Sequence, residues 1–123
     1  MRDILFRGKT TTTKKSRWIY GLLLKNEYGW QIINDKQVKY VFEYSISEYI
    51  GVKDVKRKKI FEGDILKDTD GLTYIVVFEN QCFTLRQYLD DVVGDLGKYP
   101  GKITSEYEIV GNIYDIIEKE ENN

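Results

Sequence analysis

The sequence contains no histidine and a single cysteine in 123 residues. The absence of histidine excludes Ser-His-Asp and Cys-His catalysis, histidine general bases and zinc sites with histidine ligands. A single cysteine, Cys82, excludes an intrachain disulfide and a thiolate-based structural zinc site. Any enzyme on this chain would therefore use carboxylates, lysine, tyrosine or a metal bound by oxygen ligands. We expect no cofactor and no enzymatic activity.

Long apolar runs and an excess of charge of one sign are also absent. The apolar run near the N-terminus, Ile4 to Phe6, is too short for a signal peptide, and later runs are too short for a membrane span. We therefore expect a cytoplasmic protein without a membrane partner. The net charge is −1, so non-specific binding to DNA would require a local basic patch.

The residues that are present favour strands. Aromatic residues make up 14% of the chain, and the 41% of hydrophobic residues are typical of one globular domain. Segments 18–24 and 28–33 form a candidate hairpin, in which Gly21 predicts a bulge or a close backbone approach. Asp70-Gly71 is a strong turn signal, and 74–78 reads as a central strand buried on both faces. Further strands are expected at 4–6, 38–42, 60–66, 82–85 and 107–114.

Two short helices are also predicted. Ser45 and Glu48 have the spacing of a capping box, which predicts a helical turn over 45–50. Apolar residues at helical spacing predict a second helix over 85–96. Its exposed face would carry Asp90, Asp91 and Asp95. The tail 118–123 is expected to be solvated and frayed, and Cys82, within an apolar stretch, is expected to be a small core residue.

The segment Glu62-Gly63-Asp64-Ile65 is the sharpest motif. If it is a continuous strand, Glu62 and Asp64 lie on one face and can bind one cation, with Glu79 as a further carboxylate. The structural alternative is that Gly63-Asp64 shapes the turn before an apolar strand, with the carboxylate accepting backbone amides. We favour the structural alternative.

A basic stretch covers residues 53–59, with a net charge of +4 in seven residues. Its cations are candidate contacts to a nucleic acid or another partner, with tryptophans or tyrosines as stacking surfaces: Lys53, Lys56, Arg57, Lys58 and Lys59. A solvated loop that happens to be basic is the alternative. A second basic zone contains Arg7, Lys9, Lys14, Lys15 and Arg17.

The ten tyrosines exceed what a core of this size can bury. Tyrosine is enriched at protein interfaces, where its flat ring adds contact area at low entropic cost. The tyrosine content therefore favours protein contacts, self-association in particular.

Four segments together resemble the YopX family: 4–9, 49–54, 59–65 and 108–114. They occur in the family's order and span nearly the whole chain, and Trp18 followed by Gly21 also fits. The turn Val55-Lys56-Arg57-Lys58 departs from the family pattern, which usually has a glycine-containing turn there. The resemblance implies a phage-encoded or prophage-encoded protein in a bacterial host cell, and supplies no catalytic residues.

The resemblance also implies a fold. We expect one YopX-like domain over 1–123, mainly β with a minor α component, and with 1–50 and 60–115 as candidate subdomains. The C-terminal half would be a small SH3-like barrel beside an N-terminal β-rich subdomain. The first functional hypothesis is a non-enzymatic protein-interaction module that forms a homo-oligomer and binds a further, unknown protein. The alternatives are a nucleic-acid-binding small barrel that uses loop 53–59 and, last, a metal-dependent carboxylate enzyme.

Overall fold

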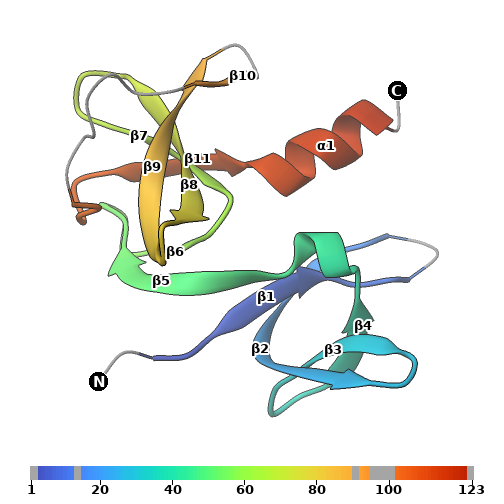
Figure 1. Ribbon diagram of the computed structural model, residues 1–123. Coiled ribbons are helices and arrows are strands. Elements are labelled where there is room, and N and C mark those ends of the chain that lie inside the picture. Colours follow the sequence, from blue (N-terminus) through green and yellow to red (C-terminus); the bar gives the residue numbers. More distant parts are fainter. Residues whose placement is uncertain (1–2, 13–14, 90–91, 95–101, 122–123) are drawn as a thin grey trace. The chain divides into compact units, whose positions relative to one another are not determined.

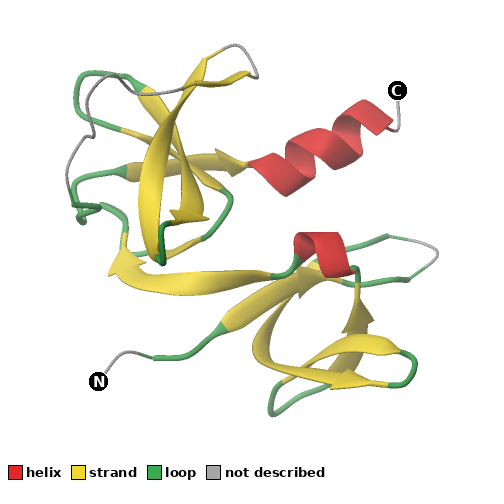
Figure 2. Ribbon diagram, in the orientation of Figure 1, coloured by secondary structure: helices red, strands yellow, loops and turns green. Residues whose placement is uncertain are grey.

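The computed structural model describes residues 3–12, 15–89, 92–94 and 102–121 (Figure 1). Strands dominate these residues, as Figure 2 shows, which confirms the mainly β prediction. The chain divides into two compact units, Met1–Tyr49 and Ile50–Asn123. The sequence had suggested 1–50 and 60–115, so the linking segment 51–59 belongs to the second unit.

The first unit is an antiparallel sheet with the strand order β4-β3-β2-β1-β5. Its elements are β1 (Phe6–Lys9), β2 (Trp18–Asn26), β3 (Gly29–Ile33), β4 (Val38–Val41), the short 3-10 helix η1 (Glu43–Ser45) and the start of β5 (Ser47–Lys53). The predicted hairpin is confirmed, because Leu22 pairs with Ile33 and Leu24 with Gln31. Gly21 lies so close to the Ile33 carbonyl that a side chain there would overlap it, which confirms the predicted close approach.

One face of this sheet forms a small core. Ile19, Ile32 and Val41 are buried, and Phe6, Leu23 and Trp30 pack against them. The end of β4 is tied back to the end of β1, since the Phe42 amide donates to the Lys9 carbonyl at 2.9 Å. These contacts fix which face of β2, β3 and β4 points away from the core.

The second unit contains an antiparallel sheet with the order β10-β9-β8-β7-β11. Its elements are the remainder of β5, then β6 (Lys59–Phe61), β7 (Asp64–Lys67), β8 (Thr73–Glu79), β9 (Cys82–Leu89), β10 (Val92–Gly94), β11 (Glu108–Asn112) and α1 (Ile113–Glu121). The Asp70-Gly71 turn between β7 and β8 is confirmed, and Gly71 has φ +86°. The described residues form no closed barrel.

Both faces of this sheet are covered, which explains why β8 is almost continuously apolar. Leu66, Val76 and Leu85 belong to the main core on one face. On the opposite face, Ile65, Ile75 and Tyr88 pack against Ile113 and Ile116 of α1. The helix therefore seals the second face.

The predicted helices were wrong in their positions. Segment 85–96 is strand as far as it is described: β9 pairs with β8, and Val92 pairs with Leu89. Leu85 and Leu89 belong to β9 whereas Val92 and Val93 belong to β10, so the helical spacing arises from two consecutive antiparallel strands. The three acidic residues expected on the exposed face of that helix all lie outside the described residues: Asp90, Asp91 and Asp95.

The turn predicted over 45–50 was also wrong, because Ser47 and Glu48 pair with β1. The Ser45 hydroxyl accepts from the Lys9 amide at 2.7 Å and donates to the Phe42 carbonyl at 2.7 Å, so it caps no helix. The Ser45 amide, which the Glu48 side chain of a capping box would have accepted, donates to the Phe42 carbonyl at 3.0 Å instead.

The closing strand is shorter than predicted, and the segment that follows is helical. Strand β11 ends at Asn112, and α1 extends to Glu121, through most of the tail expected to be frayed. Asn112 Oδ1 accepts the Asp115 amide at 2.8 Å and thus caps the first turn. Cys82 is exposed rather than buried, because it directly follows the two-residue turn Asn80-Gln81.

Candidate functional site

The basic loop, residues 53–59, connects β5 to β6 at the surface of the second unit. All five cations are exposed. Lys53 ends β5, Lys59 begins β6, and Lys56, Arg57 and Lys58 lie in the turn between them. The structure therefore places the five predicted contact residues on one short hairpin.

Asp54, which sequence reasoning did not single out, holds this loop in shape. Its side chain is buried at 2% exposure. Oδ1 accepts the amides of Lys56 at 2.9 Å and Lys58 at 2.8 Å, and Oδ2 accepts the Ile109 amide of β11 at 3.0 Å. The backbone adds a bond from the Asp54 amide to the Lys58 carbonyl at 2.7 Å. An aspartate two residues before the turn's centre is a typical turn former, and this signal was available in the sequence.

The electrostatics of the loop follow from these contacts. Burial acts to raise the pKa of the Asp54 carboxyl, but the three backbone amides hold that pKa below its ordinary value of 3.8. Lys56 Nζ lies 2.8 Å from Glu108 Oε2, and this contact raises the pKa of Lys56.

Arg57 has φ +68°, a conformation that favours glycine or asparagine, so its backbone is strained.

The second basic zone does not form one exposed surface. Arg7 and Lys9 are only 5% and 7% exposed. The Arg7 guanidinium lies 4.4 Å and the Lys9 ammonium 5.3 Å from the centre of the Trp18 ring, and Arg7 Nε donates to the Ser47 hydroxyl at 3.0 Å. Lys15 and Arg17 are exposed, whereas Lys14 lies outside the described residues. Cation–π packing therefore accounts for Arg7 and Lys9.

The structural interpretation of Asp64 is confirmed. Asp64 is buried, and its Oδ2 accepts the Phe61 amide at 2.8 Å. Glu62 and Asp64 do not share a strand face, because Gly63 turns the chain between β6 and β7 with φ +86°. Glu79 forms a bidentate ion pair with Arg86, at 2.5 and 2.8 Å. Across the described part of the chain, no group of three or more His, Cys, Asp or Glu side chains is placed to hold a metal ion.

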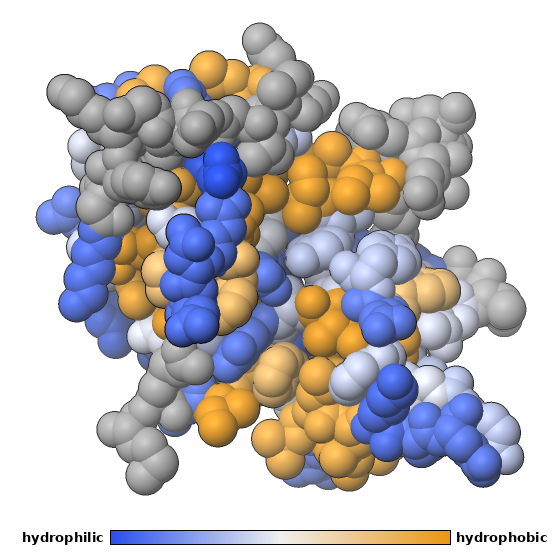
Figure 3. Space-filling view, in the orientation of Figure 1, coloured by the Kyte–Doolittle hydropathy of each residue, from blue (hydrophilic) through white to orange (hydrophobic). Residues whose placement is uncertain are grey.

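The most extended apolar surface lies on the first unit. Residues paired across an antiparallel sheet share a face, so β2, β3 and β4 place one set of side chains opposite the core. We call six apolar or aromatic members of this set the outer face: Tyr20, Leu22, Leu24, Ile33, Val38 and Tyr40. Leu22, Leu24 and Val38 are 57%, 47% and 48% exposed. Figure 3 shows hydrophobic surface gathered over β2 and β3.

The outer face has a polar end and aromatic margins. Near the β2–β3 turn, Asn26 Nδ2 donates to Gln31 Oε1 at 3.2 Å and to the Tyr40 hydroxyl at 3.0 Å. Beyond β4, the exposed rings of Phe42 and Tyr44 stack with their centres 5.5 Å apart. Several tyrosines are thus exposed, as their number suggested, while Tyr49, Tyr74, Tyr88 and Tyr107 are buried.

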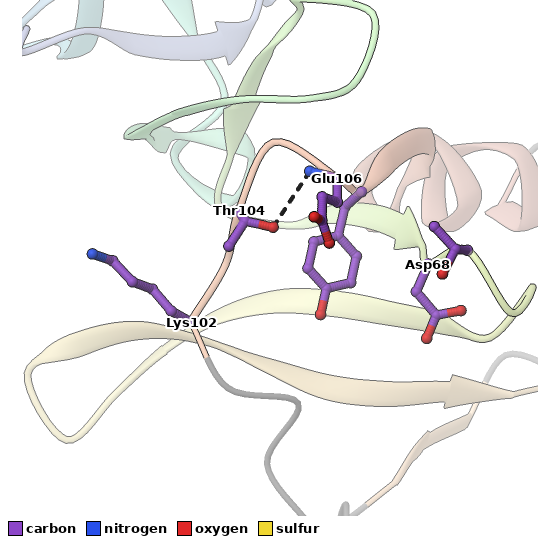
Figure 4. Close-up of a pocket in the computed structure, with 6 residues that line it drawn as sticks. Asp68, Lys102, Thr104 and Glu106 are labelled. Atoms are coloured by element: carbon purple, nitrogen blue, oxygen red, sulfur yellow. Dashed lines mark hydrogen bonds between the residues drawn. The ribbon is translucent and has the colours of Figure 1, made fainter.

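Each unit also has a surface cavity. In the second unit a cavity of about 270 Å³ is lined by Asp68, Thr69, Lys102, Thr104, Glu106 and Tyr107 (Figure 4). Its Asp68 carboxylate already accepts the Leu72 amide at 2.9 Å and the Tyr74 hydroxyl at 3.0 Å. Burial and that hydroxyl bond raise the pKa of Tyr74 to about 12. In the first unit, a cavity of about 310 Å³ is lined by Thr11, Tyr28, Gly29, Trp30, Tyr40 and Val41.

These features describe a small two-unit β protein with an exposed apolar sheet face and a basic hairpin. The chain belongs to the YopX family: the family described as YopX protein matches residues 5–118, nearly the whole chain. This match confirms the resemblance seen in the sequence. No curated protein matches the chain significantly. No helix among the described residues is long and apolar enough to cross a membrane.

Proposed function

We propose that the protein is a non-enzymatic protein-interaction module that self-associates through the outer face of its first unit. The observation that carries this proposal is the exposure of Leu22, Leu24 and Val38 side by side on one sheet face. Contiguous apolar patches of this kind are uncommon on monomeric proteins and mark interaction sites. Family membership supports a phage or prophage origin, in a bacterial host cell.

A second copy of the chain fits this face better than a charged partner. None of the side chains that β2, β3 and β4 place on it is charged, and the Arg7 and Lys9 side chains that β1 adds to the same face are only 5% and 7% exposed, so two copies meet there with little repulsion between like charges. Asn26 and Gln31 at its polar end are both donors and acceptors, which suits a symmetric contact.

The size of the face is also sufficient for a weak dimer. Five of the six side chains are 37–57% exposed and Ile33 is half-buried, so the face offers on the order of 500 Å² per copy. Two copies would bury about 1,000 Å², the lower limit for a specific interface. Association costs several kcal/mol, so we expect a dissociation constant in the micromolar range.

The second unit would then be a small SH3-like module beside the interaction unit in the chain. Its open five-stranded antiparallel sheet, in which β11 returns to pair with β7, supports this SH3-like arrangement. SH3-like folds carry diverse functions, so this arrangement alone assigns no activity.

The test is the molar mass by sedimentation velocity from about 10 to 300 μM, a range that brackets a micromolar dissociation constant. Leu22→Glu should keep the protein monomeric, because a buried unpaired carboxylate opposes the contact. Leu72→Glu is the matched control, since Leu72 is an exposed leucine in the β7–β8 turn of the other unit. A wild-type protein that stays monomeric throughout, or a control that dissociates equally, would overturn the proposal.

A further inference from the structure

The basic loop has a separate property that self-association does not use. It projects five exposed cations from seven consecutive residues of a chain whose net charge is −1. We propose that the loop binds the phosphate backbone of a nucleic acid, with Lys53, Arg57 and Lys58 as the main contacts. The proposal concerns the second unit and does not depend on the outer face.

The loop backbone is held in place before any ligand arrives. The Asp54 carboxylate accepts three amides, and the Val55 amide donates to the Tyr107 carbonyl at 2.8 Å, which ties the loop to the segment leading into β11. A loop held in this way loses less conformational entropy on binding than a free one. Burial of Asp54 also removes the one acidic side chain of the segment from the surface.

The cations of the loop are not equivalent. Lys56 forms an ion pair with Glu108 of β11. Glu108 also pairs across the sheet with Lys67 of β7, so its carboxylate has two lysines as neighbours. Lys53, Arg57 and Lys58 therefore carry the positive charge that is best placed for an external anion. Arg57 is suited to this role, since its planar guanidinium donates two parallel hydrogen bonds to a phosphate.

The backbone of Arg57 supports a functional role. At φ +68° a glycine or asparagine would be relaxed, whereas an arginine is strained. Positive φ at a residue other than glycine occurs in tight turns, as at Gln81 in the β8–β9 turn with φ +66°, and also at binding sites.

A nucleic acid fits these observations better than an anionic membrane. Polybasic segments that bind membranes adjoin a membrane helix or lie on an amphipathic helix, and they usually add buried apolar surface. The basic loop is a β hairpin whose exposed apolar residue is Val55, and it adjoins no membrane-spanning helix within the described ranges. The phosphates of a single strand or duplex supply the closely spaced negative charges that several neighbouring cations can neutralise together.

Arg57→Gly is the decisive variant, because it removes the cation and relieves the strained backbone together. Fluorescence anisotropy would follow the binding of labelled single-stranded DNA, duplex DNA and RNA from low to moderate salt. We expect the variant to weaken binding several-fold and to reduce the slope of log K against log salt by about 1. Its stability in urea should equal or exceed that of the wild type, which separates lost binding from unfolding.

Lys36→Gln is the matched control, because Lys36 is an exposed lysine in the β3–β4 turn of the first unit. It should leave the affinity within about twofold, as expected for a charge outside the contact. The proposal is overturned if wild-type protein binds none of the three probes, or if both variants weaken binding equally. Binding to vesicles of phosphatidylserine and phosphatidylcholine, without binding to nucleic acid, would overturn it in favour of a membrane surface.

Discussion

Replacing Asp54 with alanine removes one acceptor from three backbone amides at once. Hydrogen bonds to a charged acceptor contribute about 1.5–3 kcal/mol each, but amides in an exposed turn regain water when released. The Lys56 and Lys58 amides belong to such a turn, whereas the Ile109 amide is part of β11 and partly buried. We therefore expect Asp54→Ala to lower the free energy of unfolding by about 3 kcal/mol, or Tm by about 10 °C.

The acid dependence gives an independent check on the same residue. The folded pKa of Asp54 lies below the ordinary value of 3.8. The carboxylate's contribution is therefore complete above pH 3.8 and is lost as the pH falls through the lower folded pKa. The stability difference between wild type and Asp54→Ala should be constant near neutral pH and should shrink in acid.

Urea unfolding followed by far-UV circular dichroism measures both effects. Amide hydrogen exchange adds a local readout, since the Ile109 amide should lose protection in the variant. Asp35→Ala, at an exposed turn of the first unit, is the control and should change stability by less than about 0.5 kcal/mol. The reasoning fails if Asp54→Ala behaves like the control, or if Ile109 keeps its protection.

Substitutions at Gly63 and Asn112, each with its own control, test the second unit. Gly63→Ala places a methyl group against the Tyr114 ring at φ +86°, and should cost about 3 kcal/mol from strain and overlap together. Gly71 has the same φ, and a methyl group there would meet nothing within 4 Å, so Gly71→Ala should cost only the backbone strain of about 1–2 kcal/mol. If urea unfolding shows equal losses of stability in the two variants, the Tyr114 contact is contradicted. Asn112→Ala should cost about 1 kcal/mol and speed exchange of the Asp115 amide, while Asn112→Ser keeps the cap. An unchanged exchange rate at Asp115 would show that the cap is not formed.

Local patterns correctly predicted the strands that are joined to their neighbours by short, recognisable turns. The hairpin of β2 and β3 follows from two apolar runs joined by a short polar turn, and the β7–β8 turn follows from Asp70-Gly71. The role of Asp64 was also predictable, because Gly-Asp before an apolar strand is a typical turn signal.

The predictions that failed depended on distant partners. Segment 85–96 has helical spacing, but its described residues pair as strands, 85–87 with β8 and 92–94 with β9. Helix α1 was missed although Asn112 and Asp115 have capping spacing, because the apolar residues before them predicted that the strand would continue. Cys82 is exposed because the hairpin turn, rather than its apolar neighbours, sets its position.

By itself, the sequence determined the class and the chemistry of this protein: a YopX-family chain, mainly β, without histidine chemistry and with a basic stretch at 53–59. Residue type and short-range pattern suffice for the β content, the missing histidine chemistry and the basic stretch, and the order of short motifs along the chain suffices for the family. Only the tertiary structure decided which cations are exposed, as it buried Arg7 and Lys9 against Trp18 and left Arg57 outside. It also decided that Leu22, Leu24 and Val38 share a surface, because cross-strand register, set by non-local hydrogen bonds, assigns each side chain to a face.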